Sequence, residues 1–194
     1  MDYLEYRQLR LFARYDGFYT SVILIASFAS YLAQSLFQVG SFGGQLAIML
    51  CFAFLAGAPF FLYRCLKRFS KAVPKGQLTL GRIFLYCIRA TAHAAFFFSV
   101  AQYLYLEFID NGLLFRILAN ALLQDKAESE AVLRPMGLTT NEYINMLNQI
   151  DPFSLVSSSF IMLLIGGIVL SIIISFIFTL NNQRPQKVQK IKNK

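Results

Sequence analysis

The stretch LLIGGIVLSIIISFIF, residues 163–178, decides the class of fold, because it lies in a longer segment, residues 155–180, that contains no charged side chain. A helix rises ~1.5 Å per residue, so about 20 apolar residues cross the ~30 Å hydrocarbon core of a bilayer. This segment therefore predicts a membrane-spanning helix. Three further apolar segments of similar length occupy residues 17–37, 45–66 and 83–106.

The composition of the whole chain favours the same class. Hydrophobic residues make up 57% of the sequence and charged residues only 14%, whereas a soluble domain carries about 25% charge. We therefore expect an all-α integral membrane four-helix bundle, with residues 1–182 as a single membrane domain. Residues 107–153 should form a helical connection between the third and fourth spans. Residues 183–194 should form a basic tail that is disordered beyond Pro185.

Basic and acidic connections alternate along the chain. Lysine and arginine concentrate before the first span, in residues 64–82 and in the tail, while residues 107–153 carry most of the acidic side chains. Because lysine and arginine beside a span resist translocation, this alternation predicts that both termini are cytoplasmic. The connection 107–153 should then be an extracytoplasmic helical cap.

The net charge of +8 is best explained by topology and by contact with anionic membrane lipids. Four basic residues around the end of the second span are the expected head-group contacts: Arg64, Lys67, Arg68 and Lys71. We expect no nucleic-acid partner, because no aromatic and basic platform or recognition module accompanies the charge.

Local features carry further expectations. Residues 1–15 mix arginine with tyrosine and leucine and predict a short interfacial helix. Pro59 predicts a kink or local unwinding in the second span. In the outer connection, one amphipathic helix should end before Pro135, and a second should be capped by Thr140 or Asn141. These outer helices should lie on the outer membrane surface or pack over the mouth of the bundle. The sequence leaves open whether they anchor the chain at the interface or offer a surface to a partner protein.

The stretch IRATAHAAFFF, residues 88–98, places Arg89 and the single histidine, His93, on one face of the third span. Ionisable groups inside a membrane are costly and usually face inward, so the pair could bind an anionic substrate and relay a proton. The alternative role is structural: Arg89 reaches lipid head groups or Asp16, and neutral His93 hydrogen-bonds to a neighbouring helix. We favour the structural role, because every Asp and Glu lies at a span end or outside the spans.

Small side chains recur at helical spacing in three of the spans and predict close helix packing. A docking groove for another subunit is the alternative use of the same face. The residues are Ala53 and Gly57 in the second span, Ala90 and Ala94 in the third, and Gly167, Ser171 and Ser175 in the fourth.

The sequence offers no recognisable catalytic or cofactor site. It contains no H-E-x-x-H, G-x-S-x-G or glycine-rich phosphate-binding motif. One histidine cannot form a multi-histidine metal site, and the three cysteines have no C-x-x-C spacing. We therefore expect no enzymatic activity, no cofactor and no metal.

Several stretches together resemble a known family. They are GQLTLGRIFLYCIRA leading into the third span, YLEFID at its outer end, DPFSLV before the fourth span and GGIVLSIIISFIF within it. The pattern resembles the bacterial inner-membrane family catalogued as domain of unknown function 4199, over roughly residues 17–182. This resemblance implies a four-helix protein of the bacterial cytoplasmic membrane, and it implies no established activity, cofactor or catalytic residue. His93 and the arginine-rich N-terminus depart from the commoner form of the family.

Two hypotheses about function follow. The first is a non-enzymatic accessory or assembly subunit of a cytoplasmic-membrane complex, which presents lipid-facing grooves and the acidic helical cap to a membrane-protein partner. A homo-oligomer is the alternative to such a partner. The competing hypothesis is a small transporter or channel-like oligomer that uses the polar face at Arg89 and His93.

Overall fold

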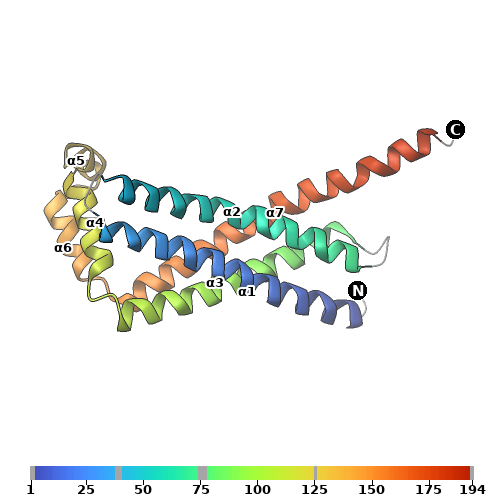
Figure 1. Cartoon of the computed structure of the whole chain (residues 1–194), viewed down its shortest axis with the longest axis horizontal. Helices are drawn as coiled ribbons and strands as arrows, with labels where there is room; N and C mark the ends of the chain where they lie inside the picture. The colour runs from blue at the N-terminus through green and yellow to red at the C-terminus, as the bar shows by residue number, and fades with distance from the viewer. Residues whose placement is uncertain (1–2, 38–40, 74–77, 125, 193–194) are drawn as a thin grey trace.

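The computed structural model describes residues 3–37, 41–73, 78–124 and 126–192, and this part of the chain forms helices without a strand (Figure 1). Four helices are long and apolar enough to cross a bilayer. They are α1 (Tyr3–Ala33), α2 (Phe42–Ala72), α3 (Leu80–Phe108) and α7 (Pro152–Lys192). The predicted all-helical fold with four candidate spans is confirmed, and it is the architecture expected of a multi-pass membrane protein.

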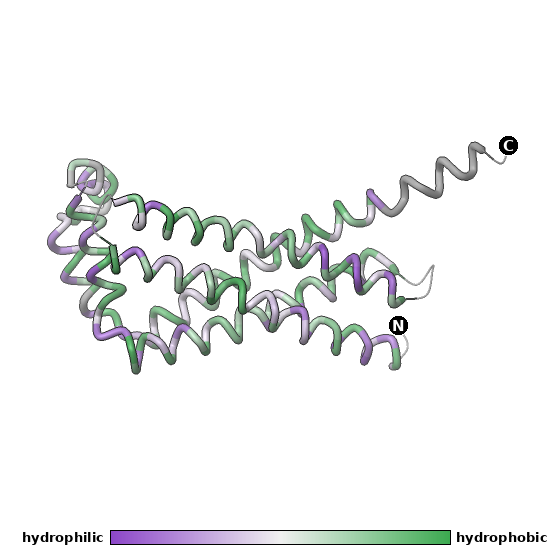
Figure 2. The backbone as a smooth tube through the Cα atoms, in the orientation of Figure 1, coloured by the Kyte–Doolittle hydropathy of each residue, from purple (hydrophilic) through white to green (hydrophobic). Residues whose placement is uncertain are grey.

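The two ends of the bundle carry different structures (Figure 1). At one end, three short helices form a cap: α4 (Leu113–Gln124), α5 (Lys126–Leu133) and α6 (Thr140–Asn148). The start of α1, the end of α2 and the start of α3 lie at the other end, which we call the basic end and define as residues 3–16, 64–73 and 78–89. Figure 2 shows that hydrophilic residues gather mostly at these two ends, with apolar residues along the helices between them.

Helix α6 begins with a capping box. The Thr139 hydroxyl accepts a hydrogen bond from the Glu142 amide at 3.3 Å, and the Glu142 carboxylate accepts one from the Thr139 amide at 2.8 Å. The predicted cap at Thr140 or Asn141 is wrong, because only Thr139 is followed three residues later by a glutamate.

The cap is joined to α3 and α7 by residues suited to tight connections. Asn111 and Gly112, between α3 and α4, both have positive φ, 46° and 77°, a conformation that asparagine and glycine adopt most readily. At the start of α7 the Asp151 carboxylate accepts a hydrogen bond from the Ser154 amide at 3.2 Å. Pro152 is the first residue of α7, where its missing amide hydrogen costs nothing.

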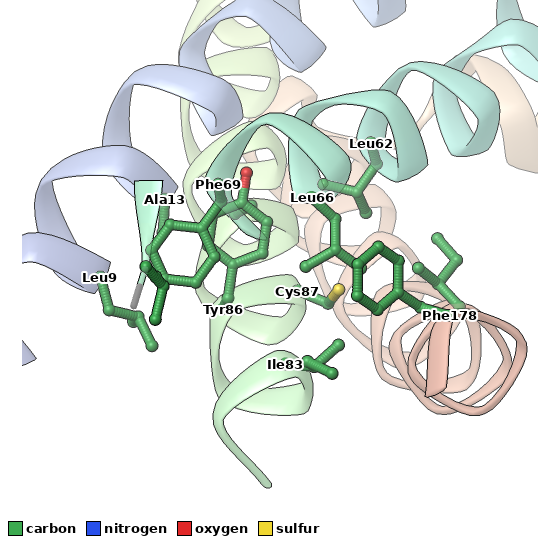
Figure 3. Close-up of a cluster of buried hydrophobic side chains, with 12 residues drawn as sticks. Leu9, Ala13, Leu62, Leu66, Phe69, Ile83, Tyr86, Cys87 and Phe178 are labelled. Atoms are coloured by element: carbon green, nitrogen blue, oxygen red, sulfur yellow. The ribbon is translucent and has the colours of Figure 1, made fainter. Parts of the chain in front are cut away.

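All four long helices meet in one apolar cluster near the basic end (Figure 3). The rings of Phe69 from α2 and Tyr86 from α3 are stacked at its centre, with centroids 4.7 Å apart. The cluster consists of Leu9, Ala13, Leu62, Leu66, Phe69, Val73, Ile83, Tyr86, Cys87, Ala90, Ile174 and Phe178. This end of the bundle is therefore closed by packing.

Toward the cap the helices form a more open row. Helix α2 packs mainly on α1 and helix α7 mainly on α3, while α1 and α3 lie together in the middle. In the most apolar 18-residue stretch of α2 only 17% is buried, whereas 39% is buried in the corresponding stretch of α3. Met49 and Phe52 of α2 are 70% and 64% exposed. This half of α2 therefore faces the surroundings of the protein.

Helices α1 and α2 extend well beyond their predicted bounds at the basic end. The N-terminal segment is not a separate interfacial helix but the first half of α1, because Leu9 and Ala13 are fully buried in the cluster. Helix α2 continues past residue 66 to Ala72, because Phe69 enters the same cluster. Pro59 lies inside α2 and the helix continues through it, so the predicted unwinding does not occur.

The outer connection and the C-terminus also differ from expectation. Ser129 donates a hydrogen bond to the Leu122 carbonyl at 3.0 Å, although a straight helix would separate these residues by ~10 Å, so the single predicted helix is bent into α4 and α5. Helix α7 reaches Lys192, and the predicted disorder beyond Pro185 is wrong up to that residue, since glutamine, lysine and arginine are good helix formers. Parts of the predicted turn and basic connection, residues 38–40 and 74–77, lie outside the described residues.

Candidate functional site

Arg89, from the predicted polar face, lies against the first turns of α1. Its guanidinium donates a hydrogen bond to the Tyr6 hydroxyl, and its central carbon lies 4.5 Å from the centroid of the Tyr6 ring. This distance is typical of a cation–π contact. Arg89 therefore binds an aromatic side chain of α1 and not Asp16, which had been its alternative partner.

His93 lies one turn further along α3, and its ring is hydrogen-bonded within its own helix, whereas a bond to a neighbouring helix was expected. Its Nδ1 lies 2.7 Å from the Arg89 carbonyl oxygen, which can only accept, so Nδ1 carries the hydrogen. Helix α1 approaches closely at this level: a Cβ on Gly17 would lie 2.7 Å from the His93 Cβ and 2.5 Å from the Ala90 oxygen. Arg89 and His93 thus lie on the same side of α3, and α1 packs against that side.

A buried carboxylate, Asp16 of α1, connects three helices at the basic end. Asp16 has no exposed surface, and both of its oxygens accept hydrogen bonds. Arg68 of α2 donates to Oδ1, and the Tyr86 hydroxyl of α3 donates to Oδ2. Such bonds offset the cost of removing the carboxylate from water, so the network fixes how α1, α2 and α3 meet.

The sequence reasoning missed this network. Asp16 and Arg68 are 52 residues apart, and the only available signal was one acidic residue beside an uncharged span. A second ion pair reinforces the contact between α1 and α3: Glu5 lies 3.5 Å from Arg82, whose side chain is only 4% exposed. Basic and acidic side chains at this end are therefore used in part to join helices.

Several small residues lie where helices approach one another. Ala90 and Ala94 of α3 are 0% and 2% exposed, and α1 passes close to Ala90 at Gly17. On the other side of α3, a Cβ on Gly167 of α7 would lie 2.9 Å from the Thr91 Cβ. These positions allow the backbones of α1, α3 and α7 to come close, as small residues do in membrane helices.

Ser171 and Ser175 are also buried in α7, and their hydroxyls bond to carbonyls one turn earlier in the same helix, at 2.7 and 2.6 Å. Ala53 and Gly57 differ from the prediction. Ala53 is exposed, and nothing lies within 4 Å of a Cβ added to Gly57. The reason is that α2 turns another face to α1, where the Ser27 hydroxyl donates to a backbone carbonyl of α2 at 2.8 Å.

The four predicted lipid contacts lie on the last turns of α2 and not in a loop. Arg64, Lys67, Arg68 and Lys71 line a surface groove of about 670 Å³, together with Tyr19 of α1. Arg64, Lys67 and Lys71 are exposed, and the Arg68 side chain is 60% exposed. The groove itself is mostly apolar, and the exposed basic side chains of α2 border it.

The described residues contain no group of three histidine, cysteine, aspartate or glutamate side chains placed to hold a metal ion. The polar chemistry that the described site offers is hydrogen bonding between helices and binding of anions by the exposed cations of α2.

No curated protein and no solved structure matches the chain significantly. The model of a family described as a protein of unknown function (DUF4199) matches residues 15–179. The matched region extends from the middle of α1 to α7 and includes the cap, the basic stretch of α2 and the face of α3 that carries Arg89. Because the match covers most of the chain, the chain belongs to this family of unknown function, DUF4199.

Proposed function

We propose that this chain is a non-enzymatic accessory or assembly subunit of a complex in the bacterial cytoplasmic membrane. In this proposal the basic end lies in the cytoplasm and the cap lies outside, as the charge distribution favours. The start of α1, the end of α2 and the start of α3 lie at the same end of the bundle, which agrees with that orientation (Figure 1).

The observation that carries the proposal is a cap that is fixed to the bundle and yet exposes apolar side chains. Leu114 of α4 is 6% exposed and packs with three residues of the long helices, Leu32, Leu106 and Val156. The amide of Leu114 also donates to the buried Asp110 carboxylate at 3.1 Å. Helix α4 is therefore anchored to the spans, and α5 and α6 pack on α4, which favours a fixed surface of the kind that recognition requires.

The outside of the cap is partly apolar. Leu123 of α4, Val132 of α5 and Met146 of α6 are 49%, 62% and 54% exposed. Apolar side chains on a fixed surface favour contact with another protein. Partial insertion of the cap into the lipid interface is the competing use of the same side chains.

The open row of helices adds support. Toward the cap, α2 contributes little to the closed part of the bundle, so its Met49 and Phe52 face either lipid or a partner helix. A subunit that completes a larger membrane assembly would leave such a face available.

The transport hypothesis receives less support from the geometry. Arg89 is bonded to Tyr6 and His93 to its own helix, and the buried Asp16 is engaged by Arg68 and Tyr86. A proton or anion pathway through the polar face would have to break these contacts.

Site-specific photo-crosslinking in native membranes tests the proposal. A benzophenone side chain is placed at Val132 or Met146 in the cap, and at Met162 of α7, which is 71% exposed, as the control. We expect a discrete protein adduct from at least one cap position and none from Met162. Lipid adducts alone at all three positions would contradict the assembly role and would favour interfacial anchoring.

The functional consequence is tested with two sets of substitutions. Val132→Lys and Met146→Lys should reduce recovery of the crosslinked partner, whereas Arg89→Leu and His93→Leu should leave it largely unchanged. If His93→Ala instead abolishes a pH-dependent flux in proteoliposomes while the protein stays folded, transport replaces assembly as the explanation.

A further inference from the structure

The last turns of α2 carry a stripe in which an aromatic residue leads into basic ones. Phe61, Arg64, Arg68 and Lys71 follow one another at spacings of three or four residues, so they lie along one side of the helix. At ~1.5 Å per residue the stripe is ~15 Å long. Its apolar end points into the span and its basic end toward the end of the bundle.

This stripe forms one wall of the groove of about 670 Å³ described above. Tyr19 of α1, which is 54% exposed, lines the groove from the neighbouring helix. Tyr63 also contributes to the lining, and its hydroxyl accepts a hydrogen bond from the Asn181 amide of α7 at 3.3 Å. The groove thus combines aromatic walls with a cluster of cations.

One basic side chain of the groove, Arg68, is held in place by a buried carboxylate of α1. The Arg68 guanidinium donates a hydrogen bond to one oxygen of the fully buried Asp16, and the other oxygen accepts one from the Tyr86 hydroxyl. The Arg68 side chain is 60% exposed, so its remaining N–H donors can reach a ligand in the groove. Asp16 offsets only one of the four positive charges, so Arg64, Lys67 and Lys71 leave an excess of positive charge along the border of the mostly apolar groove.

We propose that this groove binds one anionic phospholipid, with the phosphate on Arg64, Lys67, Arg68 and Lys71 and an acyl chain along Phe61 and Tyr19. The order of chemistry along the stripe, aromatic and then cationic, matches the order along a phospholipid from acyl chain to phosphate. A guanidinium positioned by a buried carboxylate gives the phosphate a fixed donor, which a general basic surface lacks. The inference stands independently of the partner role proposed above.

The test uses the full chain in neutral detergent and native mass spectrometry of added lipid. Dioleoyl phosphatidylglycerol and dioleoyl phosphatidylcholine are the two probes, since they share acyl chains and differ in head-group charge. We expect the first binding event to favour phosphatidylglycerol by about tenfold, as several lysine or arginine contacts to an anionic head group predict.

A charge-matched pair of variants separates the groove from general attraction. Arg64→Gln/Lys67→Gln/Lys71→Gln should lose most of the preference for phosphatidylglycerol. Arg7→Gln/Arg10→Gln/Arg14→Gln removes the same charge from exposed positions at the same end and should change the preference less than about twofold. Equal losses in the two variants, or no loss in either, would overturn the proposal.

Two further measurements keep the proposal testable if the groove variant does not fold. A photoactivatable phosphatidylglycerol should label the wild-type chain within residues 61–71, and labelling that falls mainly within residues 3–14 would contradict the site. Millimolar glycerol phosphate should not displace the bound lipid. Displacement by this soluble anion would identify a phosphate site without a lipid requirement and would also overturn the proposal.

Discussion

Removing Arg68 from its pair with Asp16 should lower the unfolding free energy more than neutralising Asp16 does. Arg68→Ala leaves the Asp16 carboxylate, which has no exposed surface, without its cation. Asp16→Asn keeps an acceptor for the Tyr86 hydroxyl, and it releases an Arg68 side chain that is already 60% exposed to water. Loss of the cation should therefore cost more than loss of the anion.

The magnitudes follow from the burial of each group. An uncompensated buried charge costs about 3 kcal/mol of unfolding free energy, so Arg68→Ala should lose about that amount. Asp16→Asn should cost about 1 kcal/mol, the difference between a charged and a neutral hydrogen bond. The double variant Asp16→Asn/Arg68→Ala contains no unpaired carboxylate and should cost about 1.5 kcal/mol, well below the sum of ~4 kcal/mol.

The assay is reversible unfolding of the detergent-solubilised full chain, followed by circular dichroism for the wild type and the three variants. Arg64→Ala is the matched control, because Arg64 is an exposed arginine one turn before Arg68, and it should change the unfolding free energy by less than about 0.5 kcal/mol. If the two single changes add to within about 0.5 kcal/mol in the double variant, the residues are not coupled and the reasoning about the buried pair is refuted.

Three further predictions concern other parts of the fold. Gly17→Ala should destabilise the chain by about 1 to 3 kcal/mol in the same assay, because the new Cβ would meet the backbone of α3. Gly57→Ala should be neutral or stabilising by up to about 1 kcal/mol, because its Cβ enters open space. Hydrogen bonds from Thr139 hold the pKa of Glu142 below its ordinary value of 4.5, so the capping box stabilises α6 fully above pH 4.5. This stabilisation is lost as the pH falls through the lowered pKa of the folded state, and amide exchange at the start of α6 should rise there. Glu142→Gln should remove this dependence on pH. Asp151→Ala should cost about 1 kcal/mol by removing the cap of α7, and an unchanged unfolding midpoint would count against that role.

The four spans could be predicted because a stretch of about 20 mostly apolar residues with at most one charged side chain is a local property of the sequence. The ends of the helices were harder to place. Arg64 to Ala72 read as a basic connection because charge was used to end the span, yet Phe69 in that stretch is fully buried and keeps it helical. The helix continues wherever tertiary packing offsets the polar residues on its other face.

The candidate site was predicted only in part. Arg89 and His93 could be placed on one side of a helix from their spacing, but their partners depended on how α1 crosses α3. The pairing of Asp16 with Arg68 could not be read from spacing, since three other cations near the end of α2 were equally available to a residue 52 positions away. The choice of packing face in α2, which excludes Ala53, likewise depends on contacts with α1.

The assembly role is tested most directly by purifying the full chain from its native membrane in a mild detergent and measuring the mass of the intact particle. The account predicts a stoichiometric larger partner that remains bound through a second purification step. Substitutions at the exposed cap residues Val132 and Met146 should remove this partner, and substitutions at Arg89 and His93 should not. A particle that contains one copy of the chain with lipid alone would contradict the account.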